Sequence, residues 1–189
     1  AYARRAVQLN LVAQAAQEAA AGRPLAVAYL DLDRFKLIND LFGHVAGDEV
    51  LRQACRRIEG LLAAGHALGR IGGDEFVIVF RGTPIQAATA ICRGVVEAIG
   101  GAAFQAGDKA FQVRVSIGLV EVAGTLEVKD AISVADRACR AAKTGTGEAR
   151  VVYQLGARVF REREQELRLL DWLSQYHGRL GPRWQPQAV

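Results

Sequence analysis

The sequence has little cysteine, no long apolar run and no concentrated basic segment. Its three cysteines lie far apart and form no C-x-x-C pair, so we expect buried thiols in a reducing cytoplasm rather than disulfides. No run approaches the ~20 apolar residues of a membrane-spanning helix, and no signal peptide is visible, so this fragment should not contact a membrane. The body has no Lys/Arg cluster interleaved with aromatic residues, which disfavours nucleic acid as a partner.

The composition is that of a globular domain. Hydrophobic residues make up 51% of the 189 residues and charged residues 23%, which is enough for one ordinary domain with a real core. The first residue is alanine rather than methionine. We therefore expect a piece of a longer cytoplasmic protein, in which any sensor or membrane anchor would lie upstream.

Hydrophobic periodicity predicts helices and strands that alternate along the chain. The 111–120 strand should have one wet face, and the helix that starts at Asp48 should carry acids in its first turn. Together the elements predict an α+β sandwich of the ferredoxin-like kind, with a central, mostly antiparallel sheet flanked by helices. The expected helices are 1–21, 35–41, 48–59, 84–99, 128–142 and 159–175, and the expected strands are 25–33, 67–71, 76–80, 111–120 and 150–153, with a short strand from Phe104 and a turn at Gly107-Asp108.

A glycine pair followed by two acids stands between two short apolar runs, in Arg70-Ile71-Gly72-Gly73-Asp74-Glu75-Phe76. Gly-Gly permits positive φ at both central positions of a tight hairpin turn. Acids that directly follow the turn of a buried hairpin indicate a positive partner nearby. For an arbitrary Gly-Gly-Asp, a solvated turn is the alternative.

A second acidic site ends the apolar run Leu25–Asp33, which predicts a fully buried strand. Alternation places Asp31 and Asp33 on the same face of that strand. The two acidic sites could converge on a divalent cation, because Mg²⁺ takes one or two carboxylates together with substrate phosphate oxygens.

Both stretches resemble the motifs of GGDEF diguanylate cyclase domains. Residues 72–76 read Gly-Gly-Asp-Glu-Phe, and residues 31–40 with Gly43-His44 and Gly47-Asp48 match the family's other motif at its spacing. The resemblance covers about residues 3–153 and implies the palm-like nucleotide cyclase fold. It also implies a reaction that joins two GTP molecules into cyclic di-GMP and releases two pyrophosphates, across two domains that face each other.

The resemblance also implies the catalytic centre. Asp31, the Leu32 carbonyl and Asp74 would bind Mg²⁺ or Mn²⁺, with Asp33 and Glu75 as further candidates. Asp74 and Glu75 are the catalytic candidates, and Asp74 matches the carboxylate that assists deprotonation of the attacking hydroxyl. For Glu75, a structural role that fixes the turn is an equal alternative.

Substrate-binding residues follow from the same match. Asn39 and Asp48 correspond to the guanine-binding pair, since an amide meets guanine's acceptors and a carboxylate meets its N1–H and exocyclic amine. Lys36 and Lys143 correspond to phosphate contacts, and Gly72-Gly73 would let the backbone approach the nucleotide. Structural roles are the alternatives: a helix N-terminal acid for Asp48, a solvated lysine for Lys36 and a plain turn for the glycines.

The chain departs from the family pattern in two places. The family's phosphate clamp continues with an Arg four residues after Lys143, but that position is Gly147, and Arg150 comes three residues late. The Arg-x-x-Asp motif of product inhibition would fall on Ala63-Ala64-Gly65-His66 and is absent.

The tail suggests a neighbouring domain, because Arg183-Trp184-Gln185-Pro186 resembles the opening strand of EAL phosphodiesterase domains. We expect a GGDEF domain over 1–154, a linker helix over 155–180 and, in 181–189, the start of a truncated EAL domain. Two functions stay open. One is an active diguanylate cyclase, whose partners are GTP and a second GGDEF domain. The other is a catalytically weak GTP-binding module that controls an EAL domain in cis. A purely structural dimerisation domain would be expected to have eroded motifs, and these are intact.

Overall fold

The computed structural model describes residues 21–122, 128–144 and 151–155. The predicted helices over 1–21 and 159–175 lie outside these residues except for Ala21, as do the predicted linker and EAL segments except for Leu155. The elements, in chain order, are β1 (Leu25–Asp33), α2 (Phe35–Phe42), α3 (His44–Glu59), β2 (Ala67–Arg70), β3 (Glu75–Arg81), α4 (Ile85–Gly100), β4 (Phe104–Ala106), β5 (Lys109–Phe111), β6 (Arg114–Glu121), α5 (Val128–Thr144) and β7 (Val151–Leu155).

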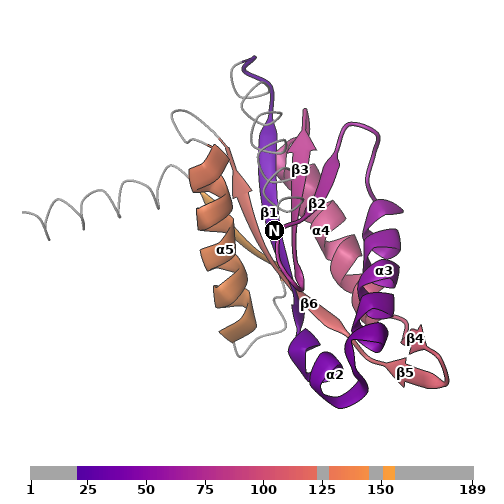
Figure 1. Ribbon diagram of the computed structural model, residues 1–189. Coiled ribbons are helices and arrows are strands. Elements are labelled where there is room, and N and C mark those ends of the chain that lie inside the picture. The colour runs from indigo at the N-terminus through magenta and orange to yellow at the C-terminus, as the bar shows by residue number, and fades with distance from the viewer. Residues whose placement is uncertain (1–20, 123–127, 145–150, 156–189) are drawn as a thin grey trace, which may run out of the picture.

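Within the described residues, the strands form a five-stranded sheet in the order β2-β3-β1-β6-β7 and a separate β4–β5 hairpin. Neighbours in the large sheet pair antiparallel, except for the parallel pair of β6 and β7. α5 covers one face of the sheet, and α3 and α4 cover the other (Figure 1). The predicted α+β sandwich with a mostly antiparallel sheet is therefore confirmed.

β1 lies at the centre of this sheet and is buried on both faces. Its even-numbered residues pack with α3 and α4, and its odd-numbered residues up to Tyr29 pack with α5. Burial on both sides explains why this strand reads as an unbroken apolar run. The pattern changes at Asp31 and Asp33, which continue the α5 face at the end of the strand.

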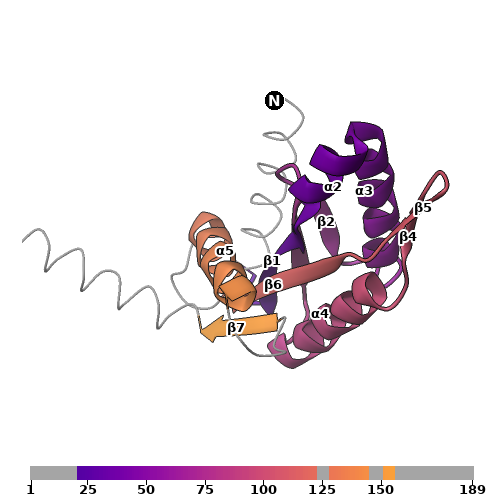
Figure 2. The ribbon, with the colours of Figure 1, turned by 90° about the horizontal axis from the view of Figure 1, so that it is seen from below.

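Apart from its exposed first residue, Arg114, β6 is also buried on both faces, so the predicted wet face is wrong over most of the strand. α5 and α4 lie on opposite sides of this strand (Figure 2). Ser116 is fully buried, and a Cβ on Gly118 would lie 1.9 Å from the carbonyl oxygen of Ala135 in α5. The small and polar residues on this face therefore reflect close packing of helix against strand rather than contact with solvent.

Helix α3 begins at His44, earlier than the predicted start at Asp48. Gly43, with a φ of 83°, separates it from α2. Asp48 consequently lies in the second turn, and no acid occupies the first turn. The predicted interaction of first-turn acids with the helix dipole is therefore wrong. The short β4–β5 hairpin is confirmed, with Gly107 at a φ of 64° in its turn.

The three cysteines are unpaired. Cys92 and Cys139 are buried as predicted, whereas Cys55 is half-buried. No helix in the described part of the chain has the length and apolar character to cross a bilayer.

Candidate functional site

Two acidic segments meet at one end of the central sheet. β1 and β3 pair antiparallel with Asp31 opposite Glu75. The backbone N–H of Leu32 donates to the carbonyl oxygen of Asp74 at 3.1 Å. The structure thus brings Asp31, Leu32, Asp74 and Glu75 together, although the two segments are distant in sequence.

Asp31 is the most constrained acid of this group. Its side chain is 17% exposed, and its Oδ2 pairs with Nζ of Lys143, near the end of α5, at 2.5 Å. Its Oδ1 is buried and has no hydrogen-bond partner in the described structure. Burial raises the pKa of Asp31, and the charges of Asp74 and Glu75 raise it further against the opposing effect of Lys143. Together, Asp31, Asp74 and Glu75 therefore place more negative charge here than Lys143 alone neutralises.

The ion pair acts on Lys143 in the opposite sense. Burial disfavours the charged ammonium, but its hydrogen bond to Asp31 outweighs that effect, and the net result raises the pKa of Lys143. Lys143 thus stays protonated and pairs with Oδ2 of Asp31. Among the described residues, no cationic group pairs with Oδ1. An additional cation beside Asp31 would remove this imbalance.

The acidic group fits a divalent metal whose remaining ligands come from water and substrate. Among residues 21–122, 128–144 and 151–155, no three His, Cys, Asp or Glu side chains are arranged to hold a metal ion by themselves. Mg²⁺ commonly uses one or two carboxylates and completes its shell with water and substrate phosphates. Asp31, Asp74 and the Leu32 carbonyl are the oxygen donors that could serve such an ion here.

Glu75 is held from two sides. Tyr29, on the same face of β1 as Asp31, interacts with the Glu75 carboxylate, and burial together with this interaction raises the pKa of Tyr29. A Cβ on Gly72 would lie 1.9 Å from Oε2 of Glu75, so a glycine is needed to accommodate this carboxylate. The sequence reasoning missed Tyr29, although its alternation with Asp31 and Asp33 was an available signal.

The loop between β2 and β3 is wider than the predicted two-residue turn. Strand pairing ends at Arg70, and the N–H groups of Ile71 and Gly72 both donate to the carbonyl oxygen of Glu75, at 2.9 and 3.3 Å. Neither Gly72 nor Gly73 has a positive φ, so the predicted tight turn with both glycines in the left-handed region is wrong. Nε and Nη2 of Arg70 donate to the carbonyl oxygen of Gly73, at 3.2 and 2.8 Å, and stabilise the loop.

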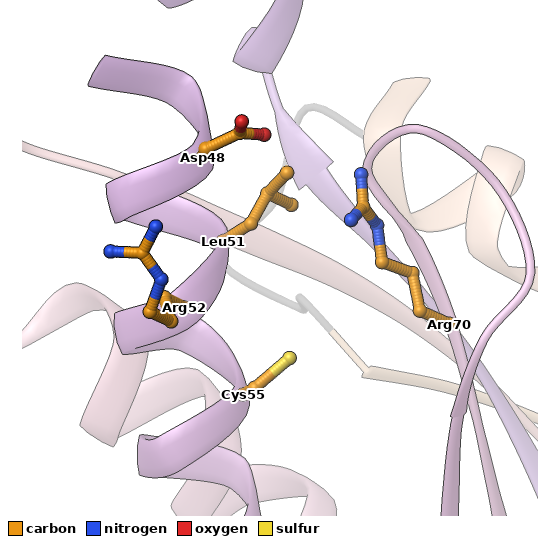
Figure 3. Close-up of a pocket in the computed structure, with 5 residues that line it drawn as sticks. All are labelled: Asp48, Leu51, Arg52, Cys55 and Arg70. Carbon is orange, nitrogen blue, oxygen red and sulfur yellow. The ribbon is translucent and has the colours of Figure 1, made fainter. Parts of the chain in front are cut away.

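The residues predicted to bind guanine lie where α2 meets α3. Asn39 is half-buried, and a Cβ on Gly47 would lie 2.0 Å from its Oδ1. Gly47 therefore lets this amide lie against α3, next to Asp48. Asp48 is exposed and lines a hollow of about 290 Å³. The rest of the described lining is Leu51, Arg52 and Cys55 on α3, with Arg70 across from them (Figure 3).

A larger cavity, of about 780 Å³, lies between the start of α2, the start of β6 and the end of α5. Lys143 and Asp33 line it. Asp33 Oδ1 accepts a hydrogen bond from the buried Ser116 hydroxyl at 2.8 Å. Lys36 is exposed on α2, and the clamp positions Gly147 and Arg150 lie outside the described residues. The remaining described lining is Arg34, Leu37, Ile38, Gln112 and Arg114.

The segment where the inhibitory motif would fall is engaged in local structure. The N–H of Ala63 donates to Nδ1 of His66 at 3.3 Å, and Nε2 of His66 lies 2.9 Å from Oγ1 of Thr83. The His66 ring packs edge-on against Phe80, with centroids 5.1 Å apart. Burial lowers the pKa of His66, and the charge of Arg81 lowers it further.

The family model described as the GGDEF domain of diguanylate cyclases matches residues 2–149. The chain is 36% identical over 135 residues to the cyclic di-GMP phosphodiesterase PdeB of Shewanella oneidensis, which covers 70% of this chain and 16% of that protein. It is 34% identical over 131 residues to the probable diguanylate cyclase DgcE of Escherichia coli, which covers 68% of this chain and 12% of that protein.

A solved structure shares the fold. The GGDEF domain of DgcB from Caulobacter crescentus, in complex with c-di-GMP, superposes with a TM-score of 0.73 and 26% identity, over 79% of this chain and 89% of that one. The chain thus matches nearly all of an isolated domain, but less than a fifth of the length of either full-length relative.

Proposed function

This chain belongs to the diguanylate cyclase family of GGDEF domains, and from that premise we propose that it condenses two GTP molecules into cyclic di-GMP. The observation that carries the proposal is the buried, unpartnered Oδ1 of Asp31 beside Asp74 and Glu75. Burying a carboxylate oxygen without a partner is unfavourable unless a cation binds it. A site that binds a metal together with a nucleoside triphosphate would supply that cation.

Asp31, Asp74 and the Leu32 carbonyl would hold Mg²⁺ or Mn²⁺. Bound there, the metal would stabilise charge on the reacting phosphate and lower the pKa of the attacking hydroxyl. Asp33 and Glu75 are already engaged, by Ser116 and Tyr29 respectively. We therefore assign these two acids to positioning the site rather than to direct ligation.

The chemical step is an in-line substitution that the side chains position. The ribose 3′-oxygen of one GTP forms a bond to the α-phosphorus of the other, and the bond from that phosphorus to the pyrophosphate oxygen breaks. Asp74 accepts the hydroxyl proton. Lys143 exchanges its bond to Asp31 for one to a phosphate oxygen, since its raised pKa keeps it charged. Lys36 contacts the phosphates, and Gly72-Gly73 let the backbone approach the nucleotide.

Guanine would be selected where α2 meets α3. The Asn39 amide would donate to the guanine acceptors, and the Asp48 carboxylate would accept from N1–H and the exocyclic amine, a pattern that adenine cannot satisfy. Because each domain would present one GTP, turnover would also need a second GGDEF domain. Rate per molecule should therefore rise with protein concentration.

The test is to incubate the purified chain with GTP and Mg²⁺ or Mn²⁺ and to separate nucleotides by chromatography. Cyclic di-GMP and pyrophosphate should form together, and neither should form with ATP, with a chelator or with Asp74→Ala. Formation of cyclic di-GMP at an undiminished rate by Asp74→Ala would overturn the assigned site.

A regulatory role is the second candidate. The clamp position is Gly147 rather than Arg, and one relative of similar identity is named a cyclic di-GMP phosphodiesterase. In this reading the chain binds GTP with a metal but turns over little, and an EAL domain in cis responds to the bound nucleotide. Metal-dependent GTP binding by calorimetry, with no product after prolonged incubation at high protein concentration, would favour this role.

A further inference from the structure

The cavity of about 780 Å³ has more basic residues in its described lining than Lys143, the one lining residue predicted to contact phosphate. Its described lining has the cationic residues Arg34, Arg114 and Lys143 and the single acid Asp33. A volume of this size lies within the roughly 300–1,000 Å³ range of small-molecule sites. The cavity thus has the size and the charge for an anionic ligand.

Arg114 occupies a defined place in this cavity. It is the first residue of β6 and lies directly opposite Asp33 in the antiparallel pairing of β1 and β6. It alternates with Ser116, which bonds to Asp33, so Arg114 lies on the α5 face of the sheet. That is the face from which Asp31 meets Lys143.

Within the part of the chain that the structure describes, Arg114 has no ion-pair partner that would account for its charge. It is exposed, although it faces Asp33 across the paired strands. Among the described residues, the recorded ion pairs are Arg52–Glu49, Arg140–Asp136 and Lys143–Asp31. A guanidinium that lines a basic cavity without such a pair is available to a ligand.

We propose that Arg114, with Lys143, binds the polyphosphate group of the nucleotide in this cavity. The inference rests on the proposed function, and it supplies the second cation that Gly147 does not provide. The planar guanidinium can donate two parallel hydrogen bonds to phosphate oxygens. Lys143 adds a point charge from α5 on the same face of the sheet. Arg114 is thus a substrate-binding residue that acts on phosphate and not on the base.

The test compares Arg114→Ala, Arg114→Lys and the matched control Arg93→Ala, which removes one exposed arginine on α4. Calorimetry with Mg²⁺ would measure the affinity of each protein for GTP and for guanosine. Arg114→Ala should weaken GTP binding about 10- to 100-fold, the loss expected for charge-assisted hydrogen bonds. It should leave guanosine affinity unchanged. Arg114→Lys should retain part of the GTP affinity, and Arg93→Ala all of it.

Each other outcome has a distinct meaning. If the parent protein binds GTP and Arg114→Ala binds it equally well, the assignment of Arg114 is wrong while the proposed function stands. Equal losses for GTP and guanosine would also overturn the assignment, because the residue would then act on the base or on the fold. If the parent protein binds no GTP with Mg²⁺, nor when Mn²⁺ replaces Mg²⁺ in the same measurement, the proposed function itself fails.

Discussion

Replacing Arg57 with alanine should lower the free energy of unfolding far more than the loss of an ordinary surface arginine. Arg57 reaches from α3 to the end of α4, where carbonyl groups lack intrahelical partners. Its Nη1 donates to the carbonyl oxygens of Ala98 and Ala102 at 3.1 and 2.7 Å, and its Nη2 to that of Ala103 at 2.8 Å. The guanidinium also lies 3.8 Å from the ring centroid of Phe104.

The expected magnitude follows from these contacts. A hydrogen bond from a charged donor contributes about 1.5–3 kcal/mol, and a cation–π contact about 0.5–1 kcal/mol at an exposed site. The contacts share one half-buried guanidinium, so they do not add in full. We expect Arg57→Ala to lose about 2–3 kcal/mol, which corresponds to a fall in Tm of about 5–10 °C for a chain of this size.

Urea unfolding followed by circular dichroism would measure the effect. Arg56→Ala is the matched control, because Arg56 is an exposed arginine in the same last turn of α3. Arg57→Met would separate the loss of the charged head from the loss of the aliphatic stem. If Arg57→Ala and Arg56→Ala unfold within about 0.5 kcal/mol of each other, the typical scatter of surface substitutions, then the contacts with α4 do not stabilise the fold as argued.

Three further predictions concern the site. Gly72→Ala should displace the Glu75 carboxylate, since its Cβ would lie 1.9 Å from Oε2, whereas the Cβ of Gly73→Ala meets no protein atom within 4 Å; in urea unfolding without nucleotide, only the first variant should lose stability. Burial raises the pKa of Asp31, so its contribution to stability is present in acid and is lost as pH rises through the raised value. In urea unfolding without metal, Asp31→Asn should therefore be more stable than the parent protein at neutral pH but not in acid. The same variant should lose Mg²⁺-dependent GTP binding. In calorimetry, Asp48→Ala should weaken the binding free energy of GTP by about 1–3 kcal/mol and leave that of ATP unchanged. Equal losses for the two nucleotides would contradict the guanine assignment.

Much of the fold was predictable because its central strand has a simple pattern. A strand covered by helices on both faces must be apolar throughout, and Leu25–Leu30 has that composition. The acids at its end were equally visible, since Asp31 interrupts the run. Their meeting with Asp74 was expected from their chemistry and depends on the antiparallel pairing of β1 with β3.

The remaining features depend on contacts that sequence alone does not reveal. Gly72 suggested backbone freedom, but its small size serves the side chain of Glu75. Ser116 and Gly118 suggested a wet strand face, but the first bonds to Asp33 and the second admits α5. The role of each of these residues depends on a partner that is distant along the chain or on another element. Local periodicity therefore did not predict these roles.

The order of the sheet also bears on how the protein is made. β1 is synthesised before the other strands of the described sheet, yet it pairs with β3 and β6. The bond from Ser116 to Asp33 spans 83 residues, an interval that a ribosome needs roughly 4–16 s to synthesise. During that interval the apolar face of β1 that later meets α5 is not yet covered by that helix. Chaperone capture of the nascent chain should therefore be strongest after β1 emerges and should decline once α5 is complete.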